Sequence, residues 1–201
     1  DSIFKVFSDS ISSRKICMLG REAQQNMATG LSFEMEKNNW NDPELNISLK
    51  NMLKMIYKTY MGDLKELNHI KEDIEKGNFK ILAPNKIFKY WKESGVLFLN
   101  VALTAVENKT GEHQKFWNSF TADLLEYISE KNEEIVYLLW GKEVQIFEKN
   151  IKSGVIIKHN HPSNSGNLSN ENDFFNGLSF ENTKSIINWT GYDEKTGKIL
   201  F

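Results

Sequence analysis

The segment Gly154–Phe175, GVIIKHNHPSNSGNLSNENDFF, joins a short apolar run to a long polar loop. The run, Val155–Ile157, is rich in β-branched residues and is typical of a buried strand. It is followed closely by His159 and His161, and then by Ser, Asn and Gly residues that enclose one apolar residue, Leu168. A buried strand that opens into a polar loop commonly presents a functional side chain at the edge of a sheet. This segment is therefore the starting point for predicting both the fold and the site.

Other apolar runs of the same kind occur along the chain, and helix-like segments alternate with them. The strand-like runs are Arg14–Leu19, Val96–Leu99, Ile135–Leu139 and Val155–Ile157. They are continuous rather than alternating, which favours a parallel sheet that is covered on both faces. We therefore predict an α/β fold of three layers, α/β/α, around a central four-stranded parallel sheet.

The polar residues that follow these runs form a candidate site, because ligands bind such sheets beyond the carboxyl ends of the strands. They are Glu22, Asn100, Gly141 and His161. Pattern alone gives this site no reaction, and each residue also has a simpler interpretation. His161 fits a hydrogen-bonded loop residue, Glu22 a solvated charge, and Asn100 a residue that caps a turn.

The spacing of apolar residues also predicts the helices. Glu112–Lys131 is predicted to be a long helix with an apolar face of Phe116, Trp117, Phe120, Leu124, Leu125 and Ile128. Phe174–Ile187 is predicted to be the last helix, and Gly20 is expected to end the first strand.

Length and composition indicate an ordinary globular protein. At 201 residues the chain is most simply one domain over residues 1–201. A net charge of −2 means that DNA binding would need a local surface rather than a global basic field. The single cysteine, Cys17, lies in an apolar run and is predicted to be a core residue. Without an apolar run of membrane-spanning length or a signal peptide, we expect a cytoplasmic monomer that does not contact membranes.

We expect neither a metal nor another cofactor. His159 and His161 form a pair, but no further Cys, His or carboxylate at ligand spacing accompanies them.

Several segments, in this order along the chain, carry a resemblance to a known family. They are the stretch Gly95–Thr121 around Asn100, the strand followed by Trp-Gly in Ile135–Gln145, His161-Pro162-Ser163, Phe174-Phe175 and Asn188-Trp189. Together they resemble the family 1 uracil-DNA glycosylases, whose loop reads His-Pro-Ser-Pro-Leu-Ser at the third of these segments. The resemblance implies a uracil-DNA glycosylase-like fold and DNA as the partner.

The resemblance also implies roles for individual residues. His161 would donate to the departing base, Asn100 would read the base edge, and Phe33 would stack on the base. Ser163 and Ser169 would grip phosphates. If Asn164-Ser165-Gly166 is an insertion, Leu168 falls on the family's leucine and becomes the wedge that replaces a flipped base. The alternative is that Leu168 only packs against its own loop.

The chain departs from the family in the loop after the first strand. The family has Gly-Gln-Asp-Pro-Tyr-His, whereas this chain reads Gly20-Arg21-Glu22-Ala23-Gln24-Gln25. In the family, the aspartate holds the attacking water and stabilises the cationic sugar. Glu22 keeps a carboxylate at this position, but its additional methylene moves that carboxylate by roughly 1.5 Å. Gln24 replaces the tyrosine that excludes thymine by packing on carbon 5. Gln24, Gln25 and Asn26 are the remaining candidate base-binding residues.

These features lead to three hypotheses. The first is a DNA glycosylase that removes a pyrimidine modified at carbon 5, such as hydroxymethylcytosine or its glucosylated form in phage DNA, and leaves an abasic site. Such an enzyme would serve in antiviral defence. The second is an ordinary uracil-DNA glycosylase of base-excision repair. The third is a catalytically inactive protein of the same fold that binds DNA or another protein.

Overall fold

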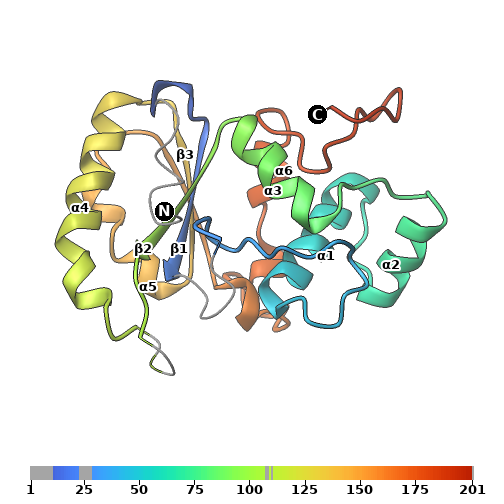
Figure 1. Cartoon of the computed structure of the whole chain (residues 1–201), viewed down its shortest axis with the longest axis horizontal. Coiled ribbons are helices and arrows are strands. Elements are labelled where there is room, and N and C mark those ends of the chain that lie inside the picture. The colour runs from blue at the N-terminus through green and yellow to red at the C-terminus, as the bar shows by residue number, and fades with distance from the viewer. Residues whose placement is uncertain (1–10, 23–28, 107–108, 110, 201) are drawn as a thin grey trace. The chain divides into compact units, whose positions relative to one another are not determined.

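The computed structural model describes residues 11–22, 29–106, 109 and 111–200. The chain divides into two compact units (Figure 1). The first unit comprises residues 1–34 and 95–160, and the second comprises residues 35–94 and 161–201. The single domain expected over residues 1–201 stays a prediction.

Within the described residues, the first unit is built on a four-stranded sheet of order β2-β1-β3-β4, in which every pair is parallel. The strands are β1 (Ile16–Glu22), β2 (Val96–Ala102), β3 (Val136–Trp140) and β4 (Val155–His159). All of β2 and β3 is buried, as expected for continuous apolar strands of a parallel sheet. The predicted four-stranded parallel sheet is therefore confirmed. The prediction that Val155–Ile157 forms a buried strand is wrong, because β4 lies at the edge of the sheet and Val155 is 58% exposed.

The prediction that Gly20 ends the first strand is wrong. Strand β1 continues to Glu22, because Gly20 pairs in register with Asn100, and Glu22 pairs with Ala102. Gly20 acts here through its missing side chain. It lets a neighbouring strand and loop approach the backbone of β1 closely, and it does not break the strand.

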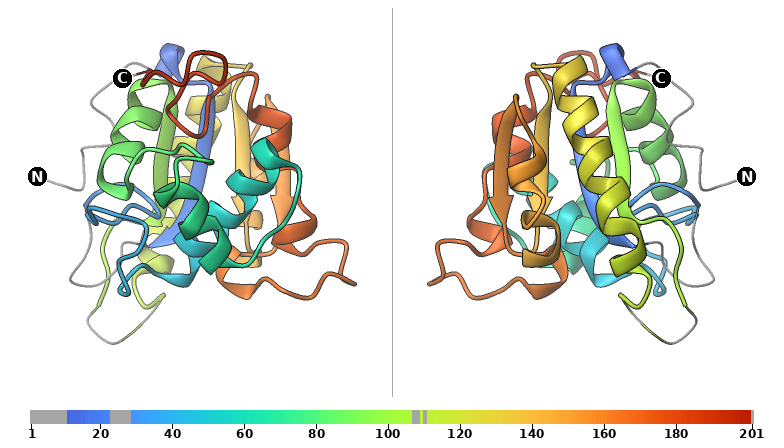
Figure 2. Two further views of the ribbon diagram at one scale, coloured as in Figure 1. Left: turned by 90° about the vertical axis from the view of Figure 1, so that its right-hand side faces the viewer. Right: turned by 90° about the vertical axis from the view of Figure 1, so that its left-hand side faces the viewer.

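Helices α4 (Gln114–Lys131) and α5 (Lys142–Gln145) pack against the sheet, α4 on β2 (Figure 2) and α5 on β1 and β3. The predicted apolar face of α4 is partly wrong. Leu125 and Ile128 are buried, but Phe116 is 80% exposed and Phe120 is 43% exposed. The buried side of the helix instead includes Thr121, whose hydroxyl donates to the carbonyl oxygen of Val101 in β2 at 2.7 Å.

The second unit is helical among the residues that the structure describes. Its helices are α1 (Ile47–Met61), α2 (Leu67–Glu75), α3 (Pro84–Glu93) and α6 (Ser179–Thr183), with short 3₁₀ turns η4 (Pro162–Asn164) and η5 (Phe174–Asn176). Helix α1 is capped at its start by the Asn46 side chain, which accepts from the N–H of Leu49 at 2.7 Å. It ends at Gly62, whose φ of 91° lies in the left-handed region.

An aromatic cluster holds the second unit together. The ring of Trp189 lies 5.3 Å from that of Trp91 and 5.0 Å from that of Phe180. The indole N–H of Trp189 donates to the hydroxyl of Thr183.

The single helix predicted over Phe174–Ile187 is wrong, since η5 and α6 are separate. The extended Gly177 divides them and lets residues on both sides bury their rings.

Candidate functional site

Asn100 and Phe33 meet above Gly20 in the first unit. Asn100 is buried in β2, directly beside Gly20 of β1. A Cβ atom built on Gly20 would lie 2.5 Å from Asn100 Oδ1 and 3.6 Å from Cε2 of the Phe33 ring. Real Cβ atoms do not approach an oxygen that closely, so only glycine fits. The amide of Asn100 and the ring of Phe33 thus converge on one point of the sheet.

Phe33 has a backbone conformation that needs support. Its φ is 65°, in the left-handed region, which costs a non-glycine residue about 1–3 kcal/mol. The neighbouring Ser32 hydroxyl donates to the carbonyl oxygen of Met18 in β1 at 3.0 Å, and the Phe33 ring packs edge-on against Trp140 at 5.7 Å. Strained residues of this kind cluster at ligand sites. These contacts fix a half-buried aromatic ring beside the buried amide.

Glu22 is held at the end of β1. It lies two residues beyond Gly20 and therefore points to the same face of the sheet. Both carboxylate oxygens accept from the backbone N–H of Gly111, at 3.0 and 2.8 Å. Gly111 has a φ of 78°, in the left-handed region that favours glycine, and it packs against the guanidinium of Arg21. The carboxylate is therefore held by the backbone of Gly111 rather than left to move in solvent.

A hydrogen-bonded chain supports the loop between β2 and α4 that carries Gly111. The indole N–H of Trp117 donates to the Thr104 hydroxyl at 2.8 Å, and that hydroxyl is hydrogen-bonded to His113 Nδ1 at 2.8 Å. The sequence analysis assigned no role to these three residues, although His113 and Trp117 lie in the stretch Gly95–Thr121 that carries the family resemblance. The pairing of His113 and Trp117 one helical turn apart, just after a polar loop, is the signal that could have indicated them.

In the second unit, His161 has a defined tautomer. It is the second residue after β4, and its Nδ1 accepts the backbone N–H of Ser163 at 3.2 Å. The Ser163 hydroxyl lies 2.8 Å from the same nitrogen. Because a backbone N–H can only donate, Nδ1 carries no proton, and the imidazole is neutral with its proton on Nε2. His161 is thus a neutral hydrogen-bond donor.

The loop after His161 displays the predicted DNA-binding residues. Leu168 is 57% exposed, and Ser169 is also exposed. The structure thus groups Glu22, Phe33 and Asn100 in the first unit, and His161, Ser163, Leu168 and Ser169 in one loop of the second. The remaining predicted residues, Gln24, Gln25 and Asn26, lie outside the described residues.

Cys17 is fully buried, as predicted, and burial raises the pKa of its thiol to about 12, so it is not a nucleophile. Within the described part of the chain, no group of three or more His, Cys, Asp or Glu side chains is arranged to hold a metal ion.

His159, at the end of β4, is a titratable group outside the predicted site. Its backbone oxygen accepts from the N–H of Gly141 and from Nε2 of Gln145, both at 2.9 Å. Its ring Nδ1 is buried, and among the described residues it has no hydrogen-bond partner. Burial disfavours the imidazolium ion and therefore lowers the pKa of His159 from its usual value of 6.5.

The lowered pKa of His159 predicts a loss of stability in acid. Below about pH 6.5 the unfolded chain binds a proton at this residue more readily than the folded chain. The free energy of unfolding therefore decreases as the pH is lowered. By urea denaturation at about pH 7.5 and about pH 5.5, we expect a smaller loss for His159→Asn than for the wild type. His69→Asn, which changes an exposed histidine of α2, should match the wild type. Equal losses in all three proteins would contradict the prediction.

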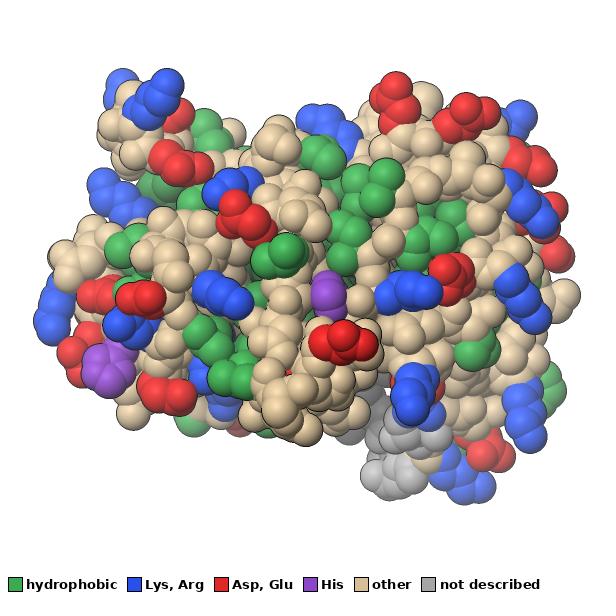
Figure 3. Space-filling view, turned by 180° about the vertical axis from the view of Figure 1, so that it is seen from behind, with side chains coloured by type: hydrophobic (Ala, Val, Ile, Leu, Met, Phe, Trp, Pro, Cys, Tyr) green, Lys and Arg blue, Asp and Glu red, His purple; other side chains and the backbone are tan. Residues whose placement is uncertain are grey.

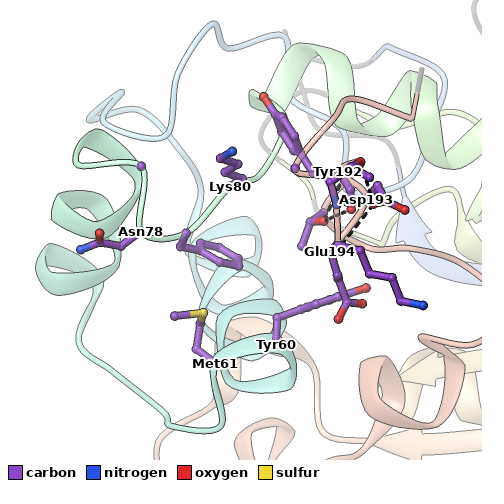
Figure 4. A pocket seen from close by; sticks show the side chains of 13 residues that line it. Tyr60, Met61, Asn78, Lys80, Tyr192, Asp193 and Glu194 are labelled. Carbon is purple, nitrogen blue, oxygen red and sulfur yellow. Dashed lines mark hydrogen bonds between the residues drawn. The ribbon is translucent and has the colours of Figure 1, made fainter.

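A cavity of about 440 Å³ lies elsewhere in the second unit (Figure 4). Tyr60, Lys80, Tyr192 and Glu194 are among its lining residues, and none of the predicted site residues is. It lies at the carboxyl end of α1, and none of its lining residues belongs to the loop after His161. The cavity is therefore separate from that loop.

The surface charges agree with the small net charge. Figure 3 shows basic and acidic side chains interspersed over the face that it displays.

In the described part of the chain, no helix is both long and apolar enough to span a membrane.

Comparisons with known proteins point to one family. No protein-family model matches the chain. A protein named uracil-DNA glycosylase from Lachnoclostridium phytofermentans is 31% identical over 199 residues, which is 96% of this chain and 78% of that protein. Its namesake from Azobacteroides pseudotrichonymphae is 29% identical over 197 residues, covering 95% of this chain and 78% of the relative.

Solved structures show the same fold. The UNG structure from Nitratifractor salsuginis superposes with a TM-score of 0.64 at 20% identity, covering 81% of this chain and 71% of that one. Mimivirus uracil-DNA glycosylase gives a TM-score of 0.58 at 24% identity, and the chain spans 54% of that protein. The predicted α/β/α fold of the uracil-DNA glycosylase type is thereby confirmed. With identity above 30% across nearly its whole length, the chain belongs to the uracil-DNA glycosylase family.

Proposed function

We propose that the chain is a DNA glycosylase. It hydrolyses the N-glycosidic bond of a pyrimidine nucleotide that has been flipped out of DNA, and it leaves an abasic site. The observation that carries this proposal is the convergence of Asn100 and Phe33 over Gly20, where a side chain would clash. A planar base needs one surface for stacking and one edge group for recognition, and these two residues supply both.

Asn100 is suited to reading a base because its amide has both a donor and acceptor sites. In a buried position, a base without the complementary edge leaves the amide unpaired, which costs about 1–3 kcal/mol. Phe33 is held in place by Trp140 and by its anchored neighbour Ser32, so its ring is ready to stack before the base arrives.

His161 and Glu22 stabilise the two opposite charges that develop in the reaction. As the bond between sugar and base breaks, its electron pair moves to the base, and the Nε2–H of His161 donates to the base oxygen that receives the charge. Glu22 offsets the positive charge on the sugar and accepts a proton from the water that attacks it.

Contacts with the DNA come from the loop after His161. The hydroxyls of Ser163 and Ser169, with nearby backbone N–H groups, bind phosphates without needing a strongly basic surface. Leu168 enters the stack in place of the flipped base, and its exposure supports this role. A monomeric state and a cytoplasmic location are parts of the same proposal.

The proposed substrate is a pyrimidine with a bulky polar group at carbon 5. Gln24 stands where the family has the tyrosine that closes this side of the pocket, and glutamine is smaller and polar. Hydroxymethylcytosine and its glucosylated form have groups of that kind. The alternative substrate is uracil, which is favoured by the name that the relatives share.

The test is base release from matched duplexes that carry uracil, thymine, cytosine, hydroxymethylcytosine or glucosylated hydroxymethylcytosine, with alkali-induced strand cleavage as the readout. We expect cleavage at the modified cytosines. A protein prepared in parallel with His161→Ala controls for contaminating glycosylases. Cleavage at uracil alone would identify an ordinary uracil-DNA glycosylase. No cleavage at any base would leave a DNA-binding protein of the same fold and overturn the proposal.

A further inference from the structure

We propose that Asp173 and Asn176 are positioning residues that hold the backbone around Leu168 ready for insertion into DNA. This inference rests on the proposed function, since it assumes that Leu168 fills the space left by a flipped nucleotide. The contacts that support it lie within the second unit, in the loop between His161 and η5 and on the helix beside it.

Asp173 binds the loop from inside. Its side chain is 0% exposed, and its Oδ2 accepts from the backbone N–H groups of Gly166 and Asn167, both at 2.9 Å. Its Oδ1 accepts from the N–H of Phe175 at 2.9 Å. A buried carboxylate is costly unless hydrogen bonds satisfy it, and three backbone donors do so here. The segment just before Leu168 is therefore tied to η5.

Asn176 fixes the other side of the turn. Its Nδ2 donates to the carbonyl oxygens of Leu168 and Asn170, both at 2.8 Å. The N–H of Asn170 in turn donates to the carbonyl oxygen of Asn167 at 2.9 Å, which closes the turn. The backbone is thus held before, at and after Leu168, while the leucine side chain stays largely exposed.

Both ends of the loop are attached to α1. Near the start of the loop, Asn51 Nδ2 donates to the carbonyl oxygen of Pro162 at 2.7 Å. Near its end, Lys58 Nζ donates to the carbonyl oxygen of Phe175 at 2.9 Å, and Lys54 Nζ lies 5.0 Å from the Phe175 ring. A long helix of the second unit therefore supports the braced loop.

A braced loop is useful for a residue that must enter a base stack. A mobile loop would lose conformational entropy on insertion, whereas a preorganised loop has already lost it during folding. Asn167 stands at the position of the second proline in the family's His-Pro-Ser-Pro-Leu-Ser loop, and the ring of a proline would fix the backbone. The Asn167 N–H, which a proline would lack, is the group that Asp173 binds. Asp173 thus supplies by hydrogen bonding the stiffness that this position otherwise lacks.

The test compares two DNA substrates, both carrying the base that the wild type removes. Flipping a base out of a duplex requires unstacking, which the wedge offsets, whereas a base in single-stranded DNA needs no wedge. For Asp173→Asn we expect base release from the duplex to fall about tenfold and release from single-stranded DNA to stay within about twofold. Asn176→Ala, which changes an exposed side chain, should do the same if Asp173→Asn does not fold.

Leu168→Ala is expected to show the same duplex-selective loss. Combining it with Asp173→Asn should lower the duplex rate little further, because both changes impair the same step, the insertion of Leu168 into the duplex. Glu171→Gln is the matched control, since it removes a carboxylate of the same loop that is exposed, and the ratio of duplex to single-strand rates should not change. Equal losses on both substrates, or no loss on either, would overturn the proposed role of Asp173 and Asn176.

Failure of the proposed function would look different, because the wild type would then release no base from either substrate. In that case binding replaces catalysis as the readout. The wild type should prefer a duplex with a tetrahydrofuran abasic site over an intact duplex, and Asp173→Asn should lose that preference. An unchanged preference in Asp173→Asn would contradict the inference.

Discussion

Replacing His161 by alanine is expected to lower the rate of base release from duplex DNA at least about 100-fold, the usual effect of removing one preorganised donor. The expectation follows from the tautomer of this residue. The Ser163 N–H occupies Nδ1, so the ring proton is on Nε2, and a neutral donor is in place before charge develops on the base. No reorganisation of the imidazole is needed during the reaction.

The loss should appear in the catalytic rate and not in duplex binding, which the loop and phosphate contacts supply. His161→Gln, which keeps an N–H donor in a less fixed position, should fall between alanine and the wild type. His69→Ala changes an exposed histidine of α2 and should retain the full rate. A wild-type rate in His161→Ala would remove this residue from the mechanism.

The sequence was sufficient to predict the strands and the residues at their ends. Continuous apolar runs located the strands to within a few residues, and the parallel arrangement followed from their alternation with helices. Asn100 and Glu22 could be placed near each other because the carboxyl ends of parallel strands share one edge of the sheet. Contacts along the chain and across neighbouring strands are thus visible in a sequence pattern.

Contacts between distant segments were not visible. Periodicity identified the apolar residues of α4, but the side that contacts β2 also depends on the bond from Thr121 to Val101. Gly20 looked like a strand end because its partners, Asn100 and the Ser32–Phe33 turn, come from elsewhere in the chain. Nothing in the local sequence around Asp173 shows that its carboxylate is buried and accepts from three backbone N–H groups.

Glu22→Gln is expected to lower base release at least about 100-fold, in the range of a lost general base. This change separates the charge of Glu22 from its structural contact. Glutamine has the same length, and its amide oxygen can still accept the N–H of Gly111, so the loop after β2 keeps its support. What disappears is the negative charge that offsets the cationic sugar and takes a proton from water.

Two further variants complete the measurement of single-turnover rates on the base that the wild type removes. Glu22→Asp keeps the charge but withdraws the carboxylate by roughly 1.5 Å from Gly111, so its rate should lie between those of Glu22→Gln and the wild type. Glu133→Gln changes an exposed glutamate just after α4 and should retain the wild-type rate. If Glu22→Gln matches the wild type, Glu22 serves only as a clamp on Gly111. If Glu22→Asp is faster than Glu22→Gln, the reaction depends on the charge itself, because the aspartate has the poorer contact with Gly111.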